Sequence, residues 1–244
     1  MKDDYVSPNK RYAYLEEIMR DILPNSVIEV LGDRLASSVV SAEEFYHMHS
    51  ADEDSVTGGL GQALAMAEPI SFIHESNSGS NRFSILISYE KVRGRGMNAP
   101  EKIYGIDGII QLSVYDDSYR NFNGKLKTKK ILPFQAKNRW SGTDKKLLEQ
   151  VEKMYEKLGT GIVIDYSDSG YKACELEPII VAEGSRDILQ KFGSLTSLAY
   201  LLKTRFLDCT VGKRDVDYEF STDKFNNGHL FHKIDIKVQC QPWG

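Results

Sequence analysis

Two short polar clusters at the ends of apolar stretches carry the side chains that could do chemistry. Asp107 lies in the glycine-flanked tetrapeptide "GIDG", near the start of the apolar stretch 103–117. Gln135 and Lys137 come at the end of a second stretch, "ILPFQAKN" (131–138). Because they are two residues apart, both side chains share one face of an extended strand. If the two stretches pair as strands, all three side chains converge at one end of a sheet.

An aspartate, a second oxygen ligand and a lysine are the parts needed to hydrolyse a phosphodiester with a hard divalent cation. Mg²⁺ takes oxygen ligands, of which the protein usually supplies one or two. The bound metal acidifies a water molecule and stabilises charge on phosphate oxygens, and a lysine can orient that water or help to deprotonate it. The competing interpretation of Asp107 and Lys137 is a surface ion pair that joins two strand ends.

The pattern of apolar residues predicts the elements that must position these side chains. Alternation predicts strands at 82–90, 103–117 and 131–138, with a polar hairpin-like connection at 117–130 and a loop at 76–81. Further strands are expected at 161–167 and 171–183, and helices at 9–23, 41–67, 141–159 and 185–207. The order helix, three strands, helix, strand predicts an α/β fold with a mixed central β-sheet flanked by helices, and with extra N- and C-terminal helices.

"GID", followed after a hairpin by "QAK", resembles the D-(x)n-(E/Q)xK core of the PD-(D/E)xK, restriction-endonuclease-like, nuclease superfamily. The predicted order of elements is also similar to that of the common core of this superfamily. The resemblance implies a restriction-endonuclease-like core at 41–182, preceded by an N-terminal helical segment (1–40). A C-terminal helical or mixed extension (183–244) would pack on the core, and the whole chain would form a single domain.

The resemblance also implies roles for the site residues. Asp107 would be the principal ligand of Mg²⁺ or Mn²⁺, with Gln135 as a secondary ligand and the Ala136 carbonyl as a third. Lys137 would act on the water. A further acidic group commonly comes from the helix before the first strand, and we expect Glu53 in "ADEDSVTGG" to supply it; the competing interpretation is an ordinary helix-face carboxylate.

One position departs from the pattern of the superfamily, because Gln135 replaces the usual second acidic ligand. The function implied is a metal-dependent endonuclease that cuts DNA in prokaryotic restriction or antiphage defence, acting as a homodimer and with a possible protein partner. The substitution leaves open a weaker metal site, or a catalytically inactive nucleic-acid-binding module of the same fold. A third possibility is a structural or regulatory protein that uses its apolar last helix to oligomerise.

Composition and charge limit the partners. With 244 residues, 41% of them hydrophobic, the chain can bury the core of one large domain, and its formal charge of −4 offers nucleic acid no overall attraction. A DNA-binding surface must therefore be local. Two basic loops and the residue after the motif are the candidates, although charge runs are usually solvated: Lys91, Arg93, Arg95 and Lys102; Lys127 and Lys129; and Arg139.

The other features of the sequence say less about function. The three cysteines are widely spaced, which argues for a reducing compartment and against a disulfide framework. No apolar run approaches the length of a membrane span, so we expect a cytoplasmic protein without a membrane partner. "GGLGQA" (58–63) lacks the full spacing of a dinucleotide loop, and the histidines are interpreted as solvated or core residues.

Overall fold

The computed structural model describes residues 22–50, 52–77, 79–93, 100–116, 122, 124–214 and 230–243. The elements in chain order are α2 (Asn25–Glu44), α3 (Tyr46–His49), α4 (Glu53–Leu64), β1 (Ile70–Ser76), β2 (Gly79–Arg93), α5 (Pro100–Tyr104), β3 (Gly108–Asp116), β4 (Lys125–Asn138), α6 (Lys145–Leu158), β5 (Ile162–Ser167), β6 (Gly170–Glu175), α7 (Leu176–Val181), α8 (Arg186–Lys191), β7 (Thr196–Ser197), α9 (Leu198–Tyr200), the π-helix η1 (Leu201–Phe206), β8 (Lys213–Arg214) and β9 (Leu230–Trp243).

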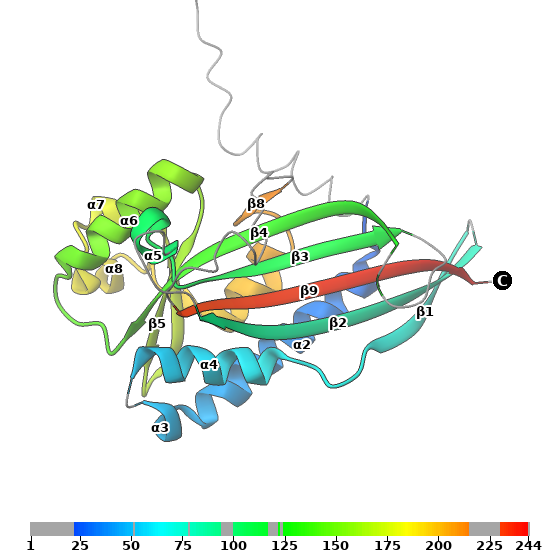
Figure 1. Cartoon of the computed structure of the whole chain (residues 1–244), viewed down its shortest axis with the longest axis horizontal. Helices are drawn as coiled ribbons and strands as arrows, with labels where there is room; N and C mark the ends of the chain where they lie inside the picture. Colours follow the sequence, from blue (N-terminus) through cyan, green and yellow to red (C-terminus); the bar gives the residue numbers. More distant parts are fainter. Residues whose placement is uncertain are drawn as a thin grey trace, which may run out of the picture.

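The described strands form one nine-stranded mixed sheet (Figure 1). Its order is β1-β2-β9-β3-β4-β5-β6-β7, and the short β8 pairs with β4. β3 runs parallel to β9 and β4 parallel to β5, whereas the other pairs are antiparallel. The predicted α/β class, with a mixed central sheet flanked by helices, is confirmed.

The C-terminal strand β9 lies in the middle of this sheet. It pairs with β2 on one side and with β3 on the other, so it separates two strands that follow each other in the sequence. The segment 183–244, which the sequence suggests is an extension packed on the core, therefore contributes a central strand. The reason is that its alternating apolar residues Ile234, Ile236 and Val238 complete the same buried face as Ile110 and Leu112 of β3.

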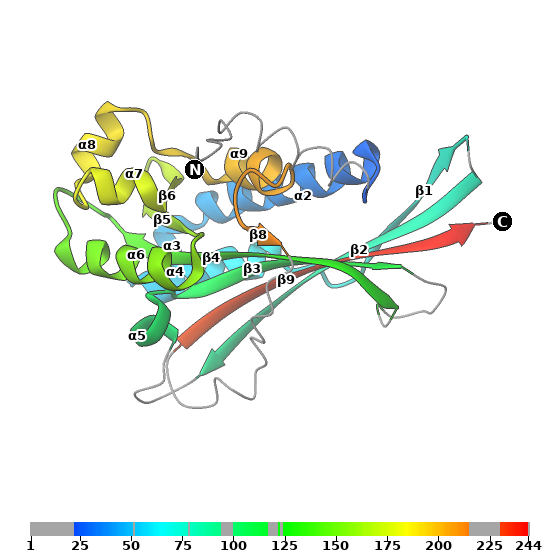
Figure 2. The ribbon, with the colours of Figure 1, turned by 90° about the horizontal axis from the view of Figure 1, so that it is seen from above.

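Two hydrophobic cores lie on the two faces of the sheet. Figure 2 shows α2 and α9 on one side of the sheet. The larger core joins one sheet face to α2, α4, α9 and η1, with Leu31, Leu35 and Leu60 fully buried. The smaller core joins the other face to α6, α7 and α8. Figure 1 shows that α6, α7 and α8 gather at one end of the sheet, while the β1–β2 and β3–β4 hairpins extend away from them.

The N-terminal helices differ from the prediction. The expected helix 41–67 is wrong in its boundaries, because α2 begins after Pro24, ends at Glu44 and is followed by the separate helices α3 and α4. The break has a local cause: the Asp52 side chain accepts a hydrogen bond from Ser55 N at 2.8 Å and so caps α4. The expected helix 9–23 lies almost entirely outside the described residues. No helix in the described part of the chain is long and apolar enough to cross a membrane.

Several later boundaries also need correction. Residues 125–130, expected in a polar connection, form the first half of β4 and pair with β3, for example Lys129 with Ser113. The expected strand 171–183 ends at Glu175, where α7 begins, and the expected helix 185–207 is broken into α8, β7, α9 and η1. Most of the expected loop 76–81 is strand, because Ser76 ends β1, residues 79–81 begin β2, and Ser76 pairs with Gly79. At 125–130 the pairing with β3 decides the local structure.

A test of the packing between α4 and the sheet uses two glycines of α4. A Cβ at Gly61 would overlap the ring of Tyr89 on β2, whereas a Cβ at Gly58 would lie 3.6 Å from the Tyr89 hydroxyl, at ordinary contact distance. We predict that Gly61→Ala destabilises the protein by about 1–2 kcal/mol, since overpacking outweighs the gain in helix propensity. Gly58→Ala should stabilise it by up to about 1 kcal/mol. Urea unfolding of both variants measures this, and equal midpoints would contradict the packing.

Candidate active site

Asp107 lies immediately before β3 and directly opposite Gln135 of β4. The neighbouring pair Gly108 and Phe134 fixes this register, and Asp107 N donates a backbone hydrogen bond to Phe134 O at 2.9 Å. Asp107 Oδ2 accepts hydrogen bonds from Ala136 N at 2.8 Å and from Gln135 Nε2. The structure therefore brings Asp107 and Gln135 into contact, through the strand pairing that the motif requires.

Gly108 is needed beside Asp107 because the backbones approach closely there. A Cβ at this position would overlap the ring of Phe134 and the carbonyl oxygen of His232 on β9. His232 N in turn donates to Asp107 O at 2.9 Å. The start of β3 is thus held on one side by the end of β4 and on the other by the start of β9.

Gln135 is 1% exposed, and its amide is oriented with the nitrogen towards Asp107. The nitrogen also lies 3.3 Å from the Ala136 carbonyl oxygen. The amide oxygen, which the sequence suggests as a metal ligand, is buried and has no hydrogen-bond partner within the described residues. A buried polar atom without a partner calls for a specific explanation, such as a bound ion or water.

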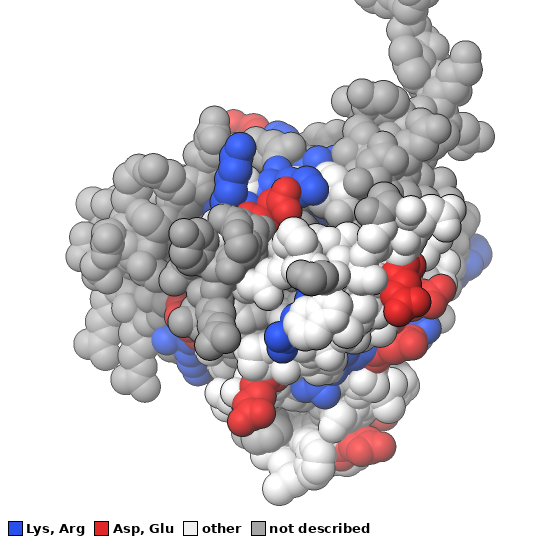
Figure 3. Space-filling model, turned by 90° about the vertical axis from the view of Figure 1, so that its right-hand side faces the viewer, with Lys and Arg blue, Asp and Glu red and all other residues white. Residues whose placement is uncertain are grey.

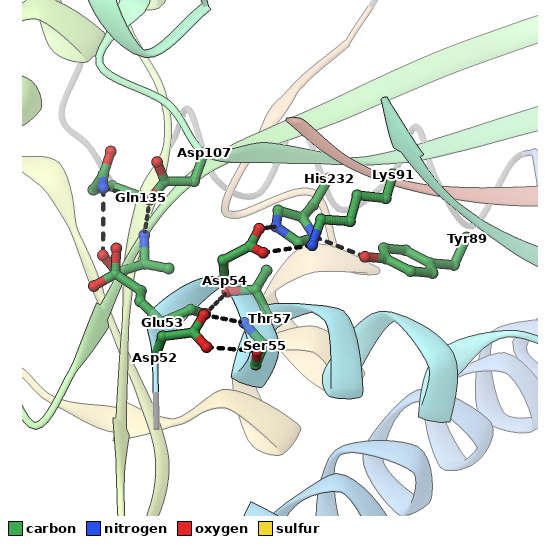
Figure 4. Close-up of polar contacts among 11 residues, drawn as sticks. Asp52, Glu53, Asp54, Ser55, Thr57, Tyr89, Lys91, Asp107, Gln135 and His232 are labelled. Carbon is green, nitrogen blue, oxygen red and sulfur yellow. Dashed lines mark hydrogen bonds and ion pairs between the residues drawn. The ribbon is translucent and has the colours of Figure 1, made fainter. Parts of the chain in front are cut away.

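Glu53 reaches the same region from the first turn of α4 (Figure 4). Its Oε2 accepts a hydrogen bond from Asn138 N at 3.1 Å, at the end of β4. The two neighbouring acids point elsewhere, because Asp52 caps the helix and Asp54 contacts Lys91 and His232. Of the three acids in this stretch, Glu53 is therefore the one directed at the end of β4.

The electrostatics of the two acids favour binding a proton or a cation. Desolvation raises the pKa of Asp107 to about 7, with a further rise from Glu53 and Glu101, against the hydrogen bond from Ala136 and the charge of Lys137. Burial likewise raises the pKa of Glu53, and Lys137 partly offsets this. Desolvation and mutual repulsion make the ionised forms of two neighbouring carboxylates unfavourable. A bound cation would reduce this free-energy cost.

Lys137 is paired in this structure. Its Nζ lies 3.4 Å from Asp144 Oδ2, and the Lys137 side chain is only 15% exposed. Asp144 also caps α6, because its Oδ1 accepts a hydrogen bond from Leu147 N at 2.8 Å. The lysine at the end of β4 is therefore held beside the start of α6.

Sequence reasoning missed four residues around this site: Asn138, Tyr46, Asp144 and Glu101. Asn138 accepts from Tyr46 OH at 2.7 Å and donates to Ser50 O at 3.0 Å, which ties α3 to the end of β4. Glu101 of α5 accepts from Gln150 Nε2 at 3.1 Å. Of these four, only Asp144 could have been found from the sequence, because an aspartate before a helical run is a typical N-cap.

The predicted DNA-binding residues do not all gather at this end of the sheet. Lys127 and Lys129 lie ten and eight residues before Lys137 on the same strand, about 34 and 27 Å away. The expected loop at 125–130 is wrong, because these residues are part of β4 and run away from Lys137. Lys127 pairs with Asp116 at 3.7 Å, and at that end of the molecule the described charges of both signs are interspersed (Figure 3).

The remaining predicted DNA-binding residues differ in whether they are exposed, paired or outside the described part of the chain. Lys102 on α5 and Arg139, just after β4, are exposed and close in sequence to Asp107 and Lys137. Lys91 is paired with Asp54 at 2.5 Å. Arg95 and the side chain of Arg93 lie outside the described residues. Lys102 and Arg139 are thus the described candidates that remain available near the site.

The donor set around Asp107 suits a hard cation. It comprises the carboxylates of Asp107 and Glu53, the amide oxygen of Gln135 and the carbonyl oxygen of Ala136, all oxygen donors of the kind that Mg²⁺ and Mn²⁺ prefer. The orphaned Gln135 oxygen and the raised pKa values of both acids agree with this chemistry. Among the described residues no group of three or more His, Cys, Asp or Glu side chains is arranged to hold a metal. A site here would therefore depend on the amide and backbone oxygens as well.

Comparison of the chain with protein-family models, with curated proteins and with solved structures found no match. The likeness to the PD-(D/E)xK superfamily is thus carried by the strand-end motif and the order of the elements alone.

The pKa of Asp107 leads to a prediction about stability without metal. The folded-state value, about 7, lies above the ordinary 3.8, so the folded protein holds the proton more tightly and loses stability as pH rises from about 4 to about 7. Asp107→Asn removes this loss and keeps an acceptor for Ala136 N. We predict that this variant has a higher Tm than the wild type at pH 7.5 in chelator, and that the difference disappears near pH 4.

The matched control is Asp116→Asn, at the exposed far end of β3, which should leave the pH dependence unchanged. Thermal unfolding between pH 4 and pH 8 measures all three proteins. An Asp107→Asn variant with the pH dependence of the wild type would show that Asp107 is not desolvated in the folded state.

Proposed function

We propose that this protein is a metal-dependent nuclease that hydrolyses phosphodiester bonds in DNA. One observation carries the proposal: Asp107 at the start of β3 meets Gln135 and Ala136 at the end of β4, with Glu53 directed at the same strand end. These groups come from segments far apart in the sequence. Their convergence, together with a nearby lysine, is what a hydrolytic metal site requires.

The order of the elements supports a restriction-endonuclease-like core. The helix α4, the strands β2, β3 and β4, the helix α6 and the strand β5 occur in this order, with β1 inserted after α4 and α5 after β2. β3 and β4 are antiparallel, and β4 and β5 are parallel. β9, between β2 and β3, is an addition to this arrangement. Because β9 borders the candidate site through His232, the addition bears directly on the geometry of Glu53 and Asp107.

In this proposal the chain's own residues have the following tasks. Asp107, Glu53, Gln135 and the Ala136 carbonyl would hold the metal; for Gln135 this needs a rotation of the amide that turns its oxygen towards Asp107. The bound metal would activate water and stabilise charge on the phosphate. Lys137 would leave Asp144 to orient the attacking water and to stabilise the negative charge of the phosphate. Arg139 and Lys102 would contact the DNA backbone on either side.

The orientation of Gln135 also favours a second candidate, a DNA-binding module of the same fold without catalytic activity. The amide nitrogen satisfies Asp107 without any metal, and Lys137 is already neutralised by Asp144. Such a protein would bind DNA in chelator and cut nothing.

Incubation of the purified protein with supercoiled plasmid separates the two candidates. The nuclease proposal predicts nicking or linearisation with Mg²⁺ or Mn²⁺, none with Ca²⁺, and none in chelator. DNA binding without cleavage under every metal condition would favour the inactive module. Cleavage in excess chelator would contradict a metal mechanism.

Lys137→Ala tests the lysine in the same assay. We predict a loss of cleavage of about 10²–10⁴-fold with the fold intact, since Asp144 still caps α6 through Leu147 N. The control is Lys203→Ala, which removes a surface lysine that pairs with Asp33 at 2.5 Å, remote from the site. Activity of Lys137→Ala within a few-fold of that control would remove Lys137 from the mechanism.

Gln135→Glu tests the ligand role of this position without relying on cleavage. In chelator the new carboxylate faces that of Asp107, so we predict a lower Tm than in the wild type. Mn²⁺ should then raise the Tm of Gln135→Glu more than that of the wild type, because a charged oxygen binds a hard cation more strongly. Gln135→Leu should show little Mn²⁺-induced stabilisation. Equal Mn²⁺ responses of the three proteins would make Gln135 a bystander.

A further inference from the structure

A partly buried chain of hydrogen bonds lies beside the candidate site and takes no part in the chemistry described above (Figure 4). Asp54 Oδ1 lies 3.0 Å from His232 Nε2, and Tyr89 OH lies 2.8 Å from His232 Nδ1. Lys91 Nζ contacts the other oxygen of Asp54 at 2.5 Å. His232 is only 2% exposed. We refer to Asp54, His232 and Tyr89 as the relay.

The protons of the relay can be assigned from its chemistry. A carboxylate only accepts hydrogen bonds, so His232 Nε2 carries the hydrogen and donates it to Asp54. In the neutral ring Nδ1 is then an acceptor, and Tyr89 OH donates to it. Both ring nitrogens are satisfied in a single arrangement, which fixes the orientation of the imidazole and of the Asp54 carboxylate.

The relay and the candidate site share the first turn of α4. Glu53 and Asp54 are consecutive, and their side chains diverge: Glu53 reaches Asn138 on β4, whereas Asp54 reaches His232 on β9 and Lys91 on β2. β3, which starts just after Asp107, lies between β4 and β9 in the sheet. The first turn of α4 therefore crosses β3 and is hydrogen-bonded to the strands on both sides of β3, to β4 through Glu53 and to β9 through Asp54.

Tyr89 is itself held between the helix and the sheet. Its ring stacks on the His232 ring with a centroid distance of 5.9 Å and an interplanar angle of 18°. The ring also packs against α4, where a Cβ at Gly61 would overlap it, so that only a glycine fits there. The "GGLGQA" stretch, which resembles a dinucleotide loop only superficially, thus has a packing role: it lets the Tyr89 ring lie against α4.

We propose that the relay is a positioning device that holds Glu53 at Asp107, and thereby sets the metal affinity of the candidate site. This inference rests on the proposed function. Asp54, His232 and Tyr89 are positioning residues, because none of them supplies a ligand in the proposed site. The physical reason is that one peptide unit joins Asp54 to Glu53, so any rotation of the first turn of α4 moves the Glu53 carboxylate away from the end of β4. His232 also donates its backbone N–H to Asp107 O, which links the relay to the second acid.

Tyr89→Phe is the cleanest test, because it removes one hydroxyl, changes no charge and keeps the ring packed on Gly61. The matched control is Tyr171→Phe, which removes a hydroxyl that donates to the Ala42 carbonyl on α2 at 3.1 Å. Two quantities are measured on each protein. The first is amide hydrogen exchange of Asn138 in chelator, which reports its hydrogen bond to Glu53 without any metal. The second is the Mn²⁺ dissociation constant by calorimetry.

We expect Tyr89→Phe to exchange the Asn138 amide faster than both the wild type and Tyr171→Phe. We also expect its Mn²⁺ dissociation constant to rise about tenfold, as for other residues that orient metal ligands. The maximal cleavage rate should return towards that of the wild type at saturating Mn²⁺, since the ligands themselves are intact. His232→Ala should have a larger effect, and the double variant with Tyr89→Phe should be no worse than His232→Ala alone, because both act through one chain of hydrogen bonds.

The possible outcomes separate this inference from the proposed function. Unchanged Asn138 exchange and Mn²⁺ affinity in Tyr89→Phe, with only a lower Tm, would overturn the positioning role and leave the relay a structural contact. A wild-type protein that binds no Mn²⁺ overturns the proposed function. Faster Asn138 exchange in Tyr89→Phe would in that case still support the placement of Glu53 by the relay.

Discussion

The desolvated carboxylate of Asp107 is the group on which the rest of the site depends. Burying an ionised carboxylate at the end of a strand is unfavourable unless hydrogen-bond donors or cations surround it. The chain supplies two donors, Ala136 N and the amide of Gln135, but it directs Lys137 to Asp144 and brings the acids Glu53 and Glu101 nearby. Among the described residues, the surroundings of Asp107 therefore contain more negative than positive charge. Under the proposed function, a divalent cation supplies what is missing.

The site is assembled from segments that lie far apart in the chain. Asp107 and the Gln135–Lys137 strand end come from one hairpin, Glu53 from a helix that precedes it, and the support behind them from β9 at the C-terminus. β9 holds Asp107 through the His232 backbone and holds α4 through the His232 side chain. A truncated chain without β9 would lose both contacts. The C-terminal strand is thus part of the core and of the site, although the resemblance alone would have put it outside both.

The sequence was informative where local rules decide the outcome. The two-residue spacing of Gln135 and Lys137, and the pairing of their strand with the one that follows Asp107, could be read from alternation and a hairpin. The choice of Glu53 among three adjacent acids agrees with the geometry, because Asp52 is used as a cap and Asp54 in the relay. The insertion of β9 could not be read, since alternation identifies a strand but not its partner. The loop expected around Lys127 and Lys129 is wrong for a related reason: a polar, lysine-rich stretch resembles a loop, but pairing with β3 makes it a strand.

The proposed metal site is one location, the space bordered by Asp107, Glu53 and the end of β4. Crystals grown with Mn²⁺ and measured for anomalous scattering test this most directly. We predict an anomalous peak in contact with Asp107 and Glu53, with the Gln135 amide turned so that its oxygen, instead of its nitrogen, faces the ion. Saturating Mn²⁺ with no peak at this location, and with Gln135 Nε2 still donating to Asp107, would contradict it.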